Sequence, residues 1–134
     1  MIRYVIVLPH TRHKFSVTCE TLLDAQRIAE IGDVDHGVLM PGLGYCVYEH
    51  ALFVPTDKQA YCGIAGHLIA GPAVFYGFDE AGETIDLRLS EFPDVRWYLG
   101  VNDVEAAIER GEIERPCMAF NGATFWQWPD PPPK

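Results

Sequence analysis

Residues 69–87, IAGPAVFYGFDEAGETIDL, decide the fold of this chain, because they contain two apolar segments separated by a short acidic turn. The first segment is rich in β-branched and aromatic residues, which suit the pleated, half-buried surface of a sheet. Gly82 follows acidic turn formers and can adopt the positive φ that short hairpin loops need. Residues 84–87 alternate polar and apolar side chains, as a strand with one solvent-facing side does. The segment therefore predicts a β-hairpin.

Towards the N-terminus, the pattern predicts one strand and one helix. A continuous apolar run at residues 5–7 indicates a first strand over residues 2–8, and residues 9–15 then predict a basic loop. Thr18 or Thr21 is a suitable N-cap for a helix over residues 22–31, where apolar side chains recur at helical spacing. The glycine that follows predicts the end of this helix.

The middle of the chain predicts short elements. We expect a polar turn at 33–36, an extended piece at 38–40, a strand at 45–49, its partner at 52–54 and a helical turn at 57–62.

The C-terminal third predicts a second helix and a second hairpin. Asn102 is a suitable N-cap with Glu105 three residues later, and Gly111 is placed to end the helix. Residues 118–120 and 124–126 then indicate two strands joined by an Asn-Gly turn.

These elements predict an α+β fold, with a mostly antiparallel sheet of about five or six strands and two principal helices. A chain of 134 residues is long enough to build a core without metal or disulfide support. We expect a single domain over residues 1–128, followed by a Pro-rich tail at 129–134.

Composition excludes several classes of function. The net charge of −9 argues against direct nucleic-acid binding, which needs clustered Lys and Arg. No apolar run approaches the length of a membrane span, and the N-terminus lacks a signal-peptide cleavage pattern, so we expect a cytoplasmic protein without membrane contact. The four cysteines contain no CxxC pair and are expected to be buried thiols.

Motifs of known enzymes are lacking, and the candidate catalytic residues rest on proximity alone. Cys62 and His67 flank a glycine-rich turn and would form a nucleophile and a base if the fold joins them. His10 and His13 are the candidate metal ligands, although paired loop histidines are more often simply solvated. We therefore expect no cofactor and no metal.

The aromatic and acidic residues point instead to binding. The aromatic content exceeds what a small core hides, and Tyr and Trp carry much interface energy. Acidic residues gather in and after the predicted hairpin turn, where ordinary solubility is the alternative explanation. The candidate binding residues are Tyr76, Glu80, Glu83, Trp97, Trp126 and Trp128.

Residues 2–9, the helix before Gly32, residues 45–49, Ala60, residues 69–71 and residues 77–83 together carry a family resemblance. Over about residues 2–87 the chain resembles small phage- and plasmid-carried proteins catalogued as domain of unknown function three-eight-four-six. It departs from that pattern at residues 55–58, where Pro-Thr-Asp-Lys replaces an Asn-Pro or Asn-Arg element. The resemblance supplies no catalytic residues; it implies a mobile-element accessory protein in a bacterial host.

The sequence thus predicts a non-enzymatic, acidic accessory factor that binds a host protein, with a host-defence system as one target. Two alternatives stay open: a small enzyme that uses Cys62 with His67 or a His10/His13 site, and a small-ligand binder that uses the aromatic surface. A homodimer also stays open.

Overall fold

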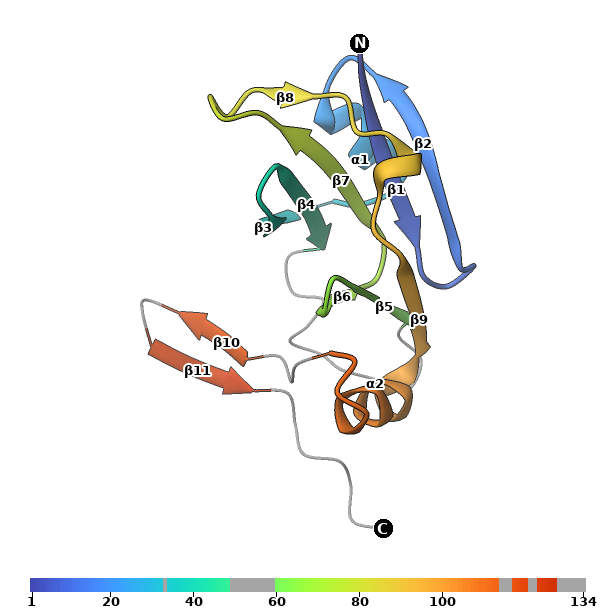
Figure 1. Cartoon of the computed structure of the whole chain (residues 1–134), viewed down its shortest axis with the longest axis vertical. Coiled ribbons are helices and arrows are strands. Elements are labelled where there is room, and N and C mark those ends of the chain that lie inside the picture. Colours follow the sequence, from blue (N-terminus) through green and yellow to red (C-terminus); the bar gives the residue numbers. More distant parts are fainter. Residues whose placement is uncertain (33, 49–59, 114–116, 121–122, 128–134) are drawn as a thin grey trace.

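The largest sheet in the described structure is antiparallel and has six strands (Figure 1). The computed structural model describes residues 1–32, 34–48, 60–113, 117–120 and 123–127. The strand order is β2-β1-β7-β4-β3, and β8 pairs with β7. The strands are β1 (Ile2–Leu8), β2 (His13–Cys19), β3 (Val34–Met40), β4 (Leu43–Tyr48), β7 (Ala73–Phe78) and β8 (Thr84–Ile85).

Two smaller sheets and two helices complete the described structure. The second sheet has the order β6-β5-β9, and a separate hairpin pairs β10 with β11. Helix α2 follows β9 directly, and a short 3-10 helix, Leu89–Glu91, precedes that strand. The bounds are α1 (Leu22–Ile28), α2 (Gly100–Glu109), β5 (Ala60–Ile64), β6 (His67–Ala70), β9 (Val95–Leu99), β10 (Cys117–Phe120) and β11 (Ala123–Gln127).

Three apolar clusters hold these layers together. One lies between α1 and the large sheet, where Ala25 of the helix and Ala29, its C-cap, pack with Tyr4 and other strand residues. Strand side chains alternate between the two faces of a sheet, so the neighbours of these residues point to the opposite face.

The central cluster joins that opposite face to the second sheet. Val5, Val7 and Phe75 of the large sheet pack there with Cys62 and Ile69 of the second sheet. The third cluster lies on the far side of the second sheet, where Tyr61, Leu68 and Tyr98 meet Val104 and Ala107 of α2. The core therefore runs from α1 through both sheets to α2, as one α+β domain.

The main sequence predictions of the fold are confirmed. The fold class is α+β with a mostly antiparallel sheet and two helices, and β1 occupies residues 2–8 as expected. The predicted hairpin is β7 and β8, and Gly82 has a φ of 80° in its turn. Thr21 caps α1, since its side chain accepts a hydrogen bond from the Asp24 N–H.

Three segments were predicted wrongly. Residues 13–15 belong to β2 and not to a loop, because Phe15, Val17 and Cys19 alternate inward along a strand that pairs with β1. Residues 34–36 belong to β3 and not to a turn, because pairing with β4 overrides the polar composition. Residues 60–62 form β5 and not a helical turn, since they lie fully buried between β6 and β9.

The end of α1 and the start of α2 also differ from the prediction. Helix α1 ends at Ile28, and Glu30, not Gly32, adopts the left-handed conformation that follows it, with a φ of 58°. Helix α2 begins at Gly100 and not after Asn102, because the Asp103 carboxylate accepts a hydrogen bond from the Leu99 N–H at 2.9 Å. Its predicted end at Gly111 is confirmed by a φ of 77° there.

The predicted C-terminal strands are confirmed as β10 and β11, which pair in antiparallel fashion. The predicted strand at residues 52–54, the Asn-Gly turn at 121–122, Trp128 and the tail at 129–134 lie outside the described residues.

Candidate protein-binding surface

Apolar and aromatic side chains gather on the large sheet beside the β7–β8 turn. The strand register places Val38 opposite Gly44 and Gly44 opposite Tyr76, so these three residues share one face of β3, β4 and β7. His36 and Phe78 lie on the same face, and both rings are 6.4 Å from the Tyr76 ring between centroids. We call His36, Val38, Tyr76 and Phe78 the aromatic patch.

The aromatic patch is accessible to solvent. Val38 is 64% exposed and His36 is exposed, whereas Tyr76 and Phe78 are half-buried. Helix α1 covers the same face further along the sheet, where its residues pack on Tyr4, Ile6 and Val74. The patch therefore lies beyond the helix, at the β3–β4 side of the sheet.

A close contact with glycine fixes the central ring of the patch. A Cβ atom at Gly44 would lie only 2.5 Å from Cζ of Tyr76, so the ring rests on the glycine backbone. Aromatic rings commonly cover cross-strand glycines in this way. Burial raises the pKa of Tyr76. The phenol is consequently neutral at physiological pH and presents an apolar ring with a polar tip.

The acidic turn, Asp79, Glu80 and Glu83, adjoins the patch along the same hairpin. Asp79 Oδ1 accepts hydrogen bonds from the Ala81 N–H at 3.0 Å and the Glu83 N–H at 2.9 Å, which fixes the turn. Glu80 and Glu83 are exposed, and within the described part of the chain their carboxylates make no hydrogen bond or ion pair. These two carboxylates can therefore meet a partner without first breaking a bond.

Among the predicted binding residues that the structure describes, three come together. Tyr76, Glu80 and Glu83 lie on one hairpin. Trp97 lies on β9, where it is half-buried against the central cluster. Trp126 belongs to β11, and Trp128 lies outside the described residues.

Sequence reasoning missed His36, Val38 and Phe78 as members of the surface. Phe78 ends β7, whereas His36 and Val38 lie on β3, VDHGVLM. That segment contains Asp and Gly, which are depleted in strands, and the sequence predicted a polar turn at 33–36. The predicted extended piece at 38–40 covers the end of this strand, and the weak alternation of Val34, His36 and Val38 along one face is a further local indication.

Cys62 is buried, whereas His67 is exposed. Cys62 is fully buried in the central cluster, and burial raises its pKa to about 12. A cysteine nucleophile reacts as the thiolate, which this environment disfavours at neutral pH. His67 is exposed at the start of β6 and pairs with Ile64, while Cys62 pairs with Ile69. The observed arrangement does not favour a nucleophile–base pair.

The two other candidate histidines lie at the tip of the β1–β2 hairpin. His10 is exposed in the turn, and His13 is exposed at the first position of β2, opposite Leu8. Within the described residues, no group of three or more His, Cys, Asp or Glu side chains is arranged to hold a metal ion. Three cysteines, Cys19, Cys46 and Cys62, are buried free thiols, as the sequence predicted.

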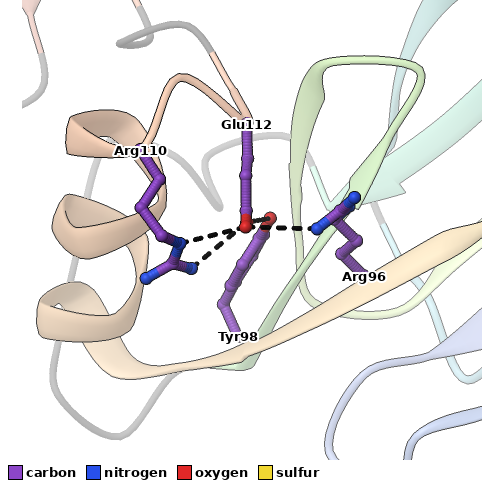
Figure 2. A network of polar contacts seen from close by, with 4 residues as sticks. All are labelled: Arg96, Tyr98, Arg110 and Glu112. Atoms are coloured by element: carbon purple, nitrogen blue, oxygen red, sulfur yellow. Dashed lines mark hydrogen bonds and ion pairs between the residues drawn. The ribbon is translucent and has the colours of Figure 1, made fainter.

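A polar network that the sequence did not indicate ties the end of α2 to β9 (Figure 2). Arg110 donates from Nε to Oε1 of Glu112 at 3.0 Å and from Nη2 to Oε2 at 3.2 Å. Arg96 Nη1 lies 3.1 Å from the same Oε1, and the Tyr98 hydroxyl donates to Oε2 at 3.0 Å. Both arginines are paired with the Glu112 carboxylate, so the network stabilises the fold and offers no unpaired charge for chemistry.

This network predicts a dependence of stability on pH. The hydrogen bond from Arg110 is the main cause that lowers the pKa of Glu112 below its usual 4.5. A carboxylate with a lowered folded-state pKa stabilises the fold above its unfolded pKa, and this stabilisation is lost as pH falls through the folded value. We expect Glu112→Gln to lower the melting temperature at about pH 7 and to reduce its fall towards about pH 3.

Thermal melts followed by circular dichroism across that range would check this expectation. Glu83→Gln is the matched control, because Glu83 is exposed in the acidic turn and should leave both the neutral melting temperature and its acid dependence almost unchanged. Equal acid dependence in Glu112→Gln and the unmodified protein would contradict the role assigned to the network.

Comparison with protein-family models, curated protein sequences and solved structures found no match to this chain. In the described part of the chain, no helix is long and apolar enough to cross a membrane.

Proposed function

We propose that this chain is a non-enzymatic binding protein that engages a basic surface of a partner protein through the aromatic patch and the acidic turn. The observation that carries the proposal is the continuity of the two features. Tyr76 and Phe78 lead along β7 directly into Asp79 and Glu80, and all four residues lie on one hairpin.

The physical chemistry of the surface suits a cationic partner. Removal of exposed apolar side chains such as Val38 from water lowers the free energy of the complex. The faces of Tyr and Phe rings attract Arg and Lys, and neighbouring carboxylates add electrostatic attraction. With a net charge of −9, the whole chain also speeds encounters with positively charged surfaces.

The proposal includes a biological setting. The resemblance to small phage- and plasmid-carried proteins leads us to place the partner in a bacterial host, with a defence protein as one target. The observed burial of Cys62 supports a binding function over a thiol-dependent enzyme.

Charge reversal in the acidic turn tests the proposal. We expect the double variant Glu80→Lys/Glu83→Lys to bind a captured partner about tenfold more weakly, or about 1.4 kcal/mol, because attraction becomes repulsion. The partner would first be captured from bacterial lysate and identified by mass spectrometry. Its affinity would then be measured by calorimetry, and the difference should shrink at high salt because the charges are exposed.

Glu20→Lys/Glu109→Lys is the matched control, since both residues are exposed, lie outside the β7–β8 hairpin and produce the same change in net charge. His67→Ala should also bind normally, because its side chain lies outside the proposed surface. Equal weakening by both double variants would show that net charge alone, and not the acidic turn, determines binding.

A further inference from the structure

Strand β3 offers an open sheet edge next to the aromatic patch. It is the last strand in the order β2-β1-β7-β4-β3, and within the described residues no strand pairs with its outer side (Figure 1). An edge strand presents unpaired N–H and C=O groups that can pair with another chain. A register shift between Val38 and Met40 limits the regular part of the strand to residues 34–38.

The composition and length of β3 distinguish it from the edge strands β2, β6 and β9. Natural edge strands are commonly protected by Lys or by short length. At the opposite edge of the large sheet, β2 carries Lys14, and in the second sheet β6 has four residues and β9 carries Arg96. Strand β3 has seven residues and no Lys, Arg or Pro. Its one acidic residue, Asp35, would attract a cationic chain.

We propose that an extended, basic segment of the partner protein pairs with the outer edge of β3 as an additional strand. This inference rests on the proposed function and names the element that the partner uses. Main-chain hydrogen bonds hold the added strand, and alternate side chains project over the same face as His36 and Val38. Lys or Arg at those positions suits the nearby aromatic rings and the net charge of −9.

Strand pairing depends on main-chain hydrogen bonds, which can be tested separately from side-chain contacts. The probe is a capped peptide of about eight residues with alternating valine and lysine, long enough to cover the regular part of an edge strand. Added to the full ¹⁵N-labelled chain, it should shift the backbone amide resonances of residues 34–38 most strongly. Methylating alternate peptide nitrogens on the pairing edge should weaken binding by about tenfold or more, because it removes main-chain donors.

A protective charge on the edge supplies the matched pair of variants. Val38→Lys should fold normally, since Val38 is 64% exposed, and should weaken peptide binding about tenfold by like-charge repulsion. Leu99→Lys adds the same charge at a position 57% exposed on β9 and should leave the affinity unchanged.

The outcomes separate this inference from the proposed function. Shifts at Tyr76 and the acidic turn without shifts in β3, or unchanged binding by the methylated peptide, would overturn strand addition and leave a side-chain binding surface. If the highest peptide concentration shifted no resonance, strand addition would be overturned, and the result would also count against a cation-binding surface.

Discussion

Phe75→Ala is expected to destabilise the protein by about 3–5 kcal/mol, because it removes a large side chain from the centre of a packed core. Phe75 is fully buried, and its ring packs edge-on against Phe92 with centroids 4.9 Å apart. Strand β7 is central in the large sheet, so this ring also lies between Val5 and Tyr45 on neighbouring strands. A small domain has only about 5–15 kcal/mol of stability, so the variant should unfold at much lower urea concentration.

The measurement is urea denaturation at equilibrium, with Val38→Ala as the control. Val38 is 64% exposed, and a truncation there should change stability by no more than about 0.5 kcal/mol. Phe75→Leu should fall between the two, since it retains most of the apolar volume. If Phe75→Ala changed stability as little as Val38→Ala, the packing assigned to Phe75 in the central cluster would be incorrect.

The sequence predicted the elements whose local preferences agree with their tertiary surroundings. Strand β1 is apolar from Tyr4 to Leu8 and pairs on both sides within the sheet, so its pattern and its burial give the same answer. The β7–β8 turn contains an aspartate whose side chain accepts a hydrogen bond from the backbone N–H two residues later, and a glycine with positive φ. These interactions lie within a few residues, where sequence reasoning works best.

The missed strands owe their extended conformation to pairing with other strands, which their own composition does not indicate. Strand β5, AYCGI, has no alternation of polar and apolar residues and is extended because it pairs with both β6 and β9. Strand β3 contains Asp35 and Gly37, and pairing with β4 determines its conformation. Gly37 also accommodates the Tyr45 ring, since a Cβ atom there would lie 2.5 Å from Cζ of that ring. A local pattern does not reveal a contact of this kind.

The same distinction explains how far the surface could be predicted. Glu80 and Glu83 follow from the turn itself, because a tight hairpin turn is exposed. Tyr76 was predicted from residue type alone, and its neighbours His36 and Val38 come from a strand about 40 residues earlier in the chain. Cross-strand register therefore creates the aromatic patch, and a local pattern does not specify that register.

Gly44→Ala tests the contact that positions the centre of this surface. The new Cβ would lie 2.5 Å from the Tyr76 ring, so the ring must leave its place on β4. Displacement of a packed ring typically costs about 1–3 kcal/mol. In a Tyr76→Ala background the same substitution should be neutral or stabilising by about 0.5–1 kcal/mol, because alanine is favoured over glycine within a strand.

The double-mutant cycle, measured by chemical denaturation, should therefore give a coupling energy of about 1.5 kcal/mol or more between Gly44 and Tyr76. Gly32→Ala is the control, since a Cβ at Gly32 would meet no atom within 4 Å and should leave stability nearly unchanged in either background. An equal cost of Gly44→Ala with and without the ring would refute the contact. A large coupling, together with weaker partner binding by Gly44→Ala, would connect the sheet to the proposed function. The reason is that Gly44 leaves room for the Tyr76 ring, and the ring in that position forms the aromatic patch beside the acidic turn.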